Sequence, residues 1–219
     1  MKIGVIGAGN IGGGIARQAT AAGHEVAVSF SRNSGALARL AAELGERVSA
    51  MTPTDTAAWA DLVIFSVPWP AIPAALAEAG PLDGRIVVDT TNQFGSGPMP
   101  APGQTAAAFN AARMRGARYT KSFNTLTAGF QAQAAGRHGG ERVVQWLCGD
   151  DAEAKKLVSG FIDGLGFVPV DCGGTKGCAV MEAPRRPGAV YGEEYRLPEA
   201  LQVLEAVRAN RPIPPTPRY

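Results

Sequence analysis

The feature that most restricts the fold of this chain is a glycine-rich motif close to its amino terminus. Residues 7–12 read G-x-G-x-x-G, directly after an apolar run and at the start of a helical pattern of small residues. A strand, a tight turn and a helix in this order begin a nucleotide-binding βαβ unit. In such a unit Gly7 permits the tight turn, Gly9 lets the backbone approach a diphosphate, and Gly12 lets the helix pack against the strand. The motif therefore predicts a dinucleotide-binding turn at the head of an α/β fold.

The helix that follows this turn would supply the electrostatics of an anion site. The amide N–H groups around Asn10 and Ile11 lie at the positive end of the helix, where they would face the diphosphate. The alternative is a glycine-rich turn that binds nothing. The strand before the turn and the helix after it make that the weaker interpretation.

Further along the chain, apolar runs alternate with helical patterns, which is typical of βαβ units around a parallel sheet. We expect strands at residues 2–7, 25–30, 47–50, 62–67, 85–89, 118–122, 141–148 and 167–170. We expect helices at residues 10–22, 35–44, 55–60, 70–79, 104–115, 150–165 and 198–209. The predicted fold class is α/β, a Rossmann-type doubly wound, mostly parallel sheet with a small C-terminal extension.

The pattern weakens near residue 173, which suggests two units. Residues 1–172 are predicted to form the dinucleotide-binding domain, and residues 173–219 a small C-terminal segment with one helix and a proline-rich tail. We expect the tail either to be a poorly ordered terminus or to lie as an arm on a partner subunit, and the usual behaviour of chain ends favours the first.

The end of the second predicted strand decides between NAD and NADP. NAD-specific units carry an acidic residue there, which binds the adenosine ribose and would repel a 2′-phosphate. Residues 29–34 contain no carboxylate, and the next acid is Glu43. Arg32 and the hydroxyls of Ser29 and Ser31 would bind a 2′-phosphate, at about 1.5–3 kcal/mol for each hydrogen bond to a charged group. A solvated Arg32 beside a serine N-cap is the alternative, but the pattern favours NADP(H).

Three further predicted strands end in residues that suit the nicotinamide half of the cofactor, because ligands of doubly wound sheets cross the carboxyl ends of the strands. These residues are Ser66, Val67 and Pro68 after the fourth strand, Thr91 and Asn92 after the fifth, and Asn124 after the sixth. The apolar members would press on the ring or its ribose and the polar members would hydrogen-bond it. An equally weighted alternative is that Pro68 only starts a helix and Asn92 only caps a loop.

Acid–base groups are sparse near these strand ends, and we predict no catalytic residue. His24 precedes the second strand at the opposite edge of the sheet, and His138 lies in a glycine-rich loop, so both are expected to be solvated. Lys121 is better placed but is more readily interpreted as a surface lysine. A reaction that needs only two rings held face to face would suit this composition.

Composition excludes several classes of function. The net charge of +2 is small and evenly spread, so nucleic-acid binding is not expected. No apolar stretch reaches the ~18 residues of a membrane span, and the amino terminus lacks a signal peptide's features. The 3 cysteines show no C-x-x-C spacing and the chain has 2 histidines, so no metal site is predicted. Reduced thiols and these absences together predict a cytoplasmic protein.

Several of these motifs together resemble one family. They are residues 7–12, 31–32, 67–69, 87–92, 121–125 and 148–151, and the similarity extends over approximately residues 1–175. This combination resembles the NADPH:coenzyme F420 oxidoreductases, which transfer a hydride between NADP(H) and the deazaflavin F420. The resemblance implies cofactor contacts at Asn10, Ile11, Ser31, Arg32, Val67 and Pro68, coenzyme F420 as the second substrate, and a homodimer.

The chain departs from that family's pattern at its C-terminal end. Family members usually close the deazaflavin cleft with a helical region, whereas residues 173–192 here are rich in glycine and proline. The wall of the second site is therefore expected to be built differently. Arg185 and Arg186 in this stretch suit either an anionic substrate, a partner subunit or plain solvation.

Two other functions fit the same residues. One is an NADPH-dependent reductase of a small imine, ketone or enone in a biosynthetic pathway. The other is a regulatory protein that senses NADPH without turnover. The scarcity of acid–base groups favours either the F420 reaction or the sensor.

Overall fold

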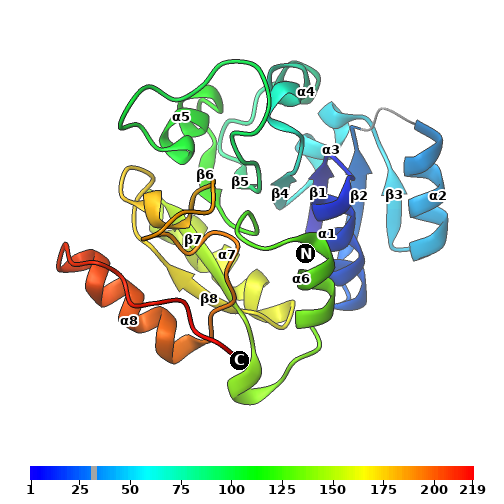
Figure 1. Ribbon diagram of the computed structural model, residues 1–219. Helices are drawn as coiled ribbons and strands as arrows, with labels where there is room; N and C mark the ends of the chain where they lie inside the picture. The colour runs from blue at the N-terminus through cyan, green and yellow to red at the C-terminus, as the bar shows by residue number, and fades with distance from the viewer. Residues whose placement is uncertain (31–33) are drawn as a thin grey trace.

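The computed structural model describes residues 1–30 and 34–219. Its centre is a sheet of eight strands in the order β3-β2-β1-β4-β5-β6-β7-β8 (Figure 1). The strands are β1 (Lys2–Ile6), β2 (Glu25–Ser29), β3 (Val48–Ala50), β4 (Leu62–Phe65), β5 (Ile86–Asp89), β6 (Arg118–Lys121), β7 (Val144–Gly149) and β8 (Val168–Asp171). Neighbouring strands run parallel except β6 and β7, which pair antiparallel. The predicted mostly parallel, doubly wound α/β fold is confirmed.

Helices cover both faces of this sheet. The helices are α1 (Asn10–Ala21), α2 (Ser34–Leu44), α3 (Pro53–Trp59), α4 (Ile72–Ala79), α5 (Ala106–Arg113), α6 (Ala128–Ala134), α7 (Ala152–Gly164) and α8 (Leu197–Arg208). Short 3₁₀ turns occur at η1 (Trp69–Ala71), η2 (Gly139–Glu141) and η3 (Cys178–Met181). Buried residues of α1, α2, α6 and α7 share one hydrophobic cluster, and those of α3, α4, α5 and α8 share the other. The chain therefore winds on both sides of the sheet, as βαβ units require.

The central strand β4 is apolar at every position because both of its faces are covered. Leu62 and Ile64 of β4 point into one hydrophobic cluster, while Val63 and Phe65 point into the other. A strand buried on both faces reads as a continuous apolar run. That is the pattern from which the sequence predicted this strand.

One helix was missed by the sequence analysis. Helix α6 begins after Thr127, whose side chain accepts a hydrogen bond from the N–H of Phe130 at 3.3 Å. It has 7 residues, of which Gln131 and Ala134 are buried, so it shows almost no periodicity. It packs beside α1 (Figure 1) and forms one wall of a groove described below.

The C-terminal segment packs on the same core as the rest of the chain. Val180, Val190 and Tyr195 belong to the cluster that holds α3, α4 and α5. The end of the proline-rich tail lies on its own chain. The hydroxyl of Tyr219 accepts from the N–H of Arg196 at 3.0 Å, and the Arg196 guanidinium lies 4.1 Å from the ring centroid. An aromatic end that stacks on a cation gives the tail an attachment that backbone pairing by prolines could not.

In the part of the chain that the structure describes, no helix is both long enough and apolar enough to cross a lipid bilayer.

Candidate functional site

The turn between β1 and α1 can be made only by glycine at two positions. Gly7 has φ +100°, and a Cβ there would lie 2.3 Å from the carbonyl oxygen of Ser66, just after the neighbouring strand β4. A Cβ on Gly12 would lie 2.1 Å from the carbonyl oxygen of Gly7. Both distances are far inside van der Waals contact. These two glycines therefore give the turn its shape and let α1 approach the sheet, as the motif predicts.

Gly9 has a different role from the other two. A Cβ on Gly9 would have no neighbour within 4 Å, so packing inside the protein does not require a glycine there. Gly9 is the N-cap of α1 and offers no side chain to its first N–H groups, and the first turn carries no acid. The result is an open, uncapped helix start beside exposed Asn10 and half-buried Ile11. This geometry fits a bound diphosphate.

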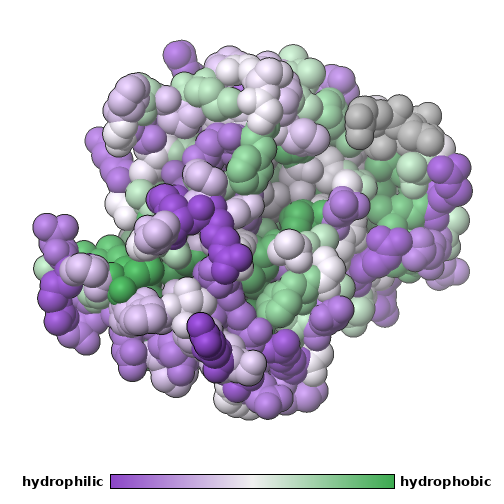
Figure 2. All heavy atoms as spheres, viewed as in Figure 1, coloured by the Kyte–Doolittle hydropathy of each residue, from purple (hydrophilic) through white to green (hydrophobic). Residues whose placement is uncertain are grey.

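A cavity of about 350 Å³ lies at the carboxyl ends of the strands, directly beyond this turn. Its lining residues are Gly9, Asn10, Ile11, Ser66, Val67, Pro68, Trp69, Thr90, Thr91, Asn92 and Phe94. The structure thus brings together three segments that the sequence predicted separately. Trp69, Thr90 and Phe94 were not among the predicted site residues. Figure 2 shows this face of the molecule hollowed near its centre, with apolar atoms in the hollow.

A second hollow of about 660 Å³ lies over α1, α2 and α6. It shares Gly9 and Asn10 with the first cavity. Its lining includes Arg17 of α1 and Glu43 of α2, which form an ion pair of 2.8 Å. An extended ligand that crosses the glycine turn therefore has room on both sides of it.

Two predicted site residues lie away from the cavity surface. Ser29 is fully buried, and its hydroxyl donates to the carbonyl of Val5 at 3.2 Å. Asn124 is 4% exposed and lies behind Asn92. Ser31 and Arg32, the residues predicted to bind a 2′-phosphate, lie outside the described residues.

Asn92 after β5 and Asn124 after β6, both predicted site residues, are hydrogen-bonded to each other. The side-chain amide of Asn92 donates to the carbonyl of Asn124 at 2.9 Å, and that of Asn124 donates to the Oδ1 of Asn92 at 3.2 Å and to the carbonyl of Met181 at 2.9 Å. Phe123, with φ +58°, turns the chain at this point. Asn124 thus joins the cavity wall to the C-terminal segment.

Beneath this wall is a buried ion pair that sequence analysis did not predict. Lys121, expected at the surface, is 0% exposed, and its Nζ lies 3.7 Å from the Oδ2 of Asp89. The reason is the strand register: Asp89 and Lys121 are directly opposite at the ends of β5 and β6. The Nζ of Lys121 also donates to the carbonyl of Thr91, which lines the cavity. A buried cation therefore anchors the backbone of the cavity wall.

Asp89 is the centre of this polar cluster. Its carboxylate accepts from the N–H of Thr91 at 2.7 Å, the side-chain amide of Asn110 at 2.8 Å and the hydroxyl of Tyr119 at 2.6 Å. Burial and the neighbouring Asp89 charge raise the pKa of Tyr119 well above its usual range. Tyr119 is therefore a neutral hydrogen-bond donor, and the cluster has its charges paired, as burial requires.

The C-terminal segment is held against the strand ends by long-range hydrogen bonds. Glu182 is 4% exposed, and its carboxylate accepts the N–H groups of Ala106 and Ala107 at the start of α5, at 2.8 and 2.7 Å. The side-chain amide of Gln93 donates to the carbonyl of Ala183 at 2.7 Å. A carboxylate at a helix N-terminus is favourable for the helix dipole. The segment is therefore fixed to the start of α5 and to the loop after β5, whose residues line the cavity.

The two arginines of that segment have partners within the protein. The Arg186 guanidinium donates to the carbonyls of Glu182, Pro184 and Ala179 at 2.7, 3.0 and 2.6 Å. Arg185 forms an ion pair of 2.5 Å with Glu193. Arg186 thus binds carbonyl groups of its own segment, and the charge of Arg185 is balanced by that of Glu193.

The two histidines lie as expected, away from this site. His24 contacts the amino-terminal nitrogen at 3.4 Å and the ring of Phe161, and partial burial lowers its pKa. His138 is exposed. Neither lines the cavity.

Comparison with known proteins relates this site to a family. Residues 2–93 match the model of the family described as coenzyme F420-dependent NADP oxidoreductases. The likeness to this family is therefore shown for the N-terminal part of the chain. The matched region contains the glycine turn and almost all of the cavity lining. The resemblance found in the sequence is confirmed over this region.

A curated relative is also a reductase. The chain is 30% identical over 183 residues to metalloreductase STEAP3 of Rattus norvegicus, a match that covers 83% of this chain and 36% of the relative. The chain thus spans about a third of the length of that relative.

Solved structures extend the likeness to most of the chain. A hypothetical protein of Sinorhizobium meliloti is 29% identical with a TM-score of 0.77, covering 90% of this chain and 95% of its own. A candidate F420-dependent NADP reductase of Arthrobacter sp. FB24 is 28% identical with a TM-score of 0.67, covering 80% and 86%. A reductive aminase of Aspergillus terreus, solved with NADPH and ethyl-5-oxohexanoate, is 25% identical with a TM-score of 0.61, covering 81% and 57%. The chain thus shares its fold with NADP-dependent oxidoreductases.

Proposed function

We propose that this protein transfers a hydride between NADP(H) and a second ring substrate, coenzyme F420. The observation that carries the proposal is the composition of the 350 Å³ cavity. Among the described residues that line it, there is no Asp, Glu, His, Lys, Cys or Tyr. Hydride transfer between two stacked rings depends on position and orientation more than on an acid or base. A reductase that must protonate an imine or a ketone would need such a group within reach.

The residues of the turn suit NADP(H). When bound, the cofactor supplies the hydride from its nicotinamide ring. The first N–H groups of α1, at Asn10 and Ile11, would bind the diphosphate, for which Gly9 leaves open space. Val67 and Pro68 would press on the nicotinamide or its ribose. Arg32 would bind the 2′-phosphate.

A direct assay tests this function. Protein, NADPH and oxidised F420 are mixed, and the visible absorbance of the deazaflavin is followed. Loss of that band at a rate proportional to enzyme supports the proposal, and Gly9→Val should abolish it. Consumption of NADPH only with a small imine or ketone would support the alternative that the Aspergillus terreus relative suggests. NADPH binding without turnover of any acceptor would identify a sensor.

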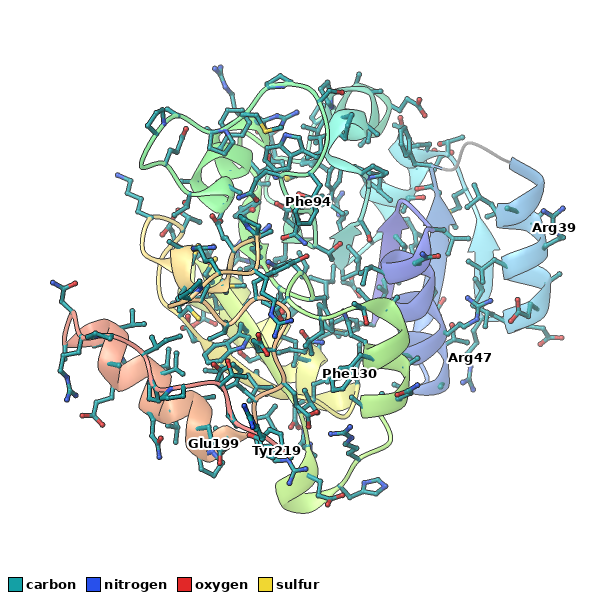
Figure 3. All side chains as sticks on the ribbon, in the orientation of Figure 1. Arg39, Arg47, Phe94, Phe130, Glu199 and Tyr219 are labelled. Atoms are coloured by element: carbon teal, nitrogen blue, oxygen red, sulfur yellow. The ribbon has the colours of Figure 1, made fainter. Side chains whose placement is uncertain are left out.

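The cofactor preference has its own test. Arg32→Ala should weaken NADPH binding far more than NADH binding, because only NADPH carries the 2′-phosphate. The affinity for NADPH should fall 10-fold or more, since each hydrogen bond to a charged group contributes about 1.5–3 kcal/mol. Arg47→Ala is the matched control, since Arg47 is exposed just before β3 (Figure 3), at the sheet edge opposite the carboxyl ends. Equal losses for both cofactors in Arg32→Ala would contradict the proposed role.

The homodimer implied by the resemblance is a further proposal, which analytical ultracentrifugation would test.

A further inference from the structure

Phe94 is an aromatic side chain left half in solvent at the mouth of the cavity. It is 51% exposed and is one of the residues that line the cavity; Figure 3 shows it near the middle of the molecule. Large aromatic rings stabilise a fold by being buried, so an exposed one contributes little to stability. The position of Phe94 therefore needs another explanation than packing.

The backbone that carries Phe94 is fixed at successive residues. The carbonyl of Thr91 accepts from buried Lys121, and the side chain of Asn92 donates to the carbonyl of Asn124 at 2.9 Å. The N–H of Phe94 donates to the carbonyl of Asn92 at 2.8 Å. A segment held by this many hydrogen bonds presents its side chain in one place. This is how a binding residue is preorganised.

A second aromatic ring supports Phe94 from the C-terminal segment. The rings of Phe94 and Tyr191 lie 6.2 Å apart at 64°, in an edge-to-face arrangement. The residue after Tyr191, Gly192, donates its N–H to the carbonyl of Thr125 at 2.8 Å, and this hydrogen bond fixes the position of Tyr191. An edge contact from one side leaves Phe94 with ring surface available to another aromatic group.

We infer that Phe94, supported by Tyr191, is the stacking platform for the second substrate and selects a planar conjugated ring. The inference rests on the proposed function and deepens it, because it names the residue that distinguishes a ring from an aliphatic imine or ketone. A planar ring stacks in offset contact on the phenyl face, whereas a puckered aliphatic substrate gains only buried area there. Reduction of the ring takes one hydride from NADPH, which leaves as NADP⁺, and one proton from solvent.

Substitutions at Phe94 test the inference through KM and kcat. With NADPH and F420, Phe94→Ala should raise KM for F420 about 10-fold, Phe94→Leu should stay close to Phe94→Ala, and Phe94→Trp should stay within about 3-fold of wild type. Binding of NADPH, measured by calorimetry, should not change. Met99→Ala is the matched control, because Met99 is 43% exposed on the same loop and does not line the cavity. If Phe94→Leu matched wild type, apolar contact rather than stacking would be sufficient, and the inference would be wrong.

A titration that needs no turnover separates this inference from the proposed function. Oxidised F420 is titrated into protein saturated with NADP⁺, for wild type and the same variants. Binding that Phe94→Ala weakens and Phe94→Trp retains supports the platform even if NADPH is never consumed, in which case only the proposed function fails. Turnover of F420 with all variants equal to wild type overturns the platform and leaves the proposed function standing. Absence of F420 binding to the wild-type complex overturns the platform.

Discussion

The buried pair of Asp89 and Lys121 makes a prediction whose size follows from its geometry. Both side chains are 0% exposed, their nearest atoms are 3.7 Å apart, and Asp89 accepts three further hydrogen bonds. Asp89→Asn would leave the Lys121 ammonium buried without a counter-charge. It would also turn an N–H₂ group toward one of the donors that now meet the carboxylate. A broken buried pair costs about 3–5 kcal/mol, and we expect a loss of unfolding free energy in that range.

The converse substitution should be milder. Lys121→Met keeps the length of the side chain, and Asp89 retains its donors Thr91, Asn110 and Tyr119. The losses are the hydrogen bond to the carbonyl of Thr91 and the ion pair, but the three remaining donors still stabilise the Asp89 carboxylate, so we expect about 1–3 kcal/mol. The double variant removes both charges. It should therefore be more stable than the sum of the single losses predicts, by about 1–3 kcal/mol.

Urea denaturation followed by tryptophan fluorescence measures the unfolding free energies of the wild type and of these variants. Trp69 and Trp146 are almost fully buried, so their fluorescence reports the folded core. NADPH affinity measured on the folded variants is the second readout. It should fall in Lys121→Met, because the carbonyl of Thr91 loses its anchor at the cavity wall. Losses that simply add in the double variant would show that the two charges do not interact, and the reasoning would be refuted.

The remaining predictions concern the turn and one helix cap. Gly12→Ala should lower the unfolding free energy by about 1–3 kcal/mol, because its Cβ would meet the Gly7 carbonyl. Gly14→Ala is the control: its Cβ has open space, so it should be neutral or stabilise α1. Equal effects of the two substitutions in thermal melts would contradict this prediction. Gly9→Val should abolish NADPH binding in calorimetry with an unchanged melting temperature, and normal binding would exclude the turn as the diphosphate site. Arg118 lowers the pKa of Asp151, so this carboxylate stabilises the fold at neutral pH and the contribution is lost as the pH falls below about 4. The melting-temperature difference between wild type and Asp151→Asn should thus shrink from pH 7 to pH 3, and a constant difference would contradict the assignment.

Much of the fold was predictable because its signals are local. The glycine motif at residues 7–12 specifies a turn through steric limits at Gly7 and Gly12, and most of the buried strands show an apolar run of their own. Gly80, with φ +72°, ends α4 as its position suggested. Helix α6 was missed because its few buried residues leave no period to detect. The predicted roles of Ser31 and Arg32 concern residues outside the described part of the chain.

The sequence by itself determined that this chain begins with a dinucleotide-binding turn, since that depends only on residues adjacent along the chain. Only the tertiary structure decided how the cavity beyond the turn is walled. Lys121 is buried because β6 happens to be the neighbour of β5, and Glu182 caps α5 from 75 residues away. The loop that carries Phe94 owes its place to the hydrogen bond between Asn92 and Asn124 and to the ring of Tyr191, which come from two other segments. Such partners are chosen by strand order and packing, and no pattern within a single segment records them.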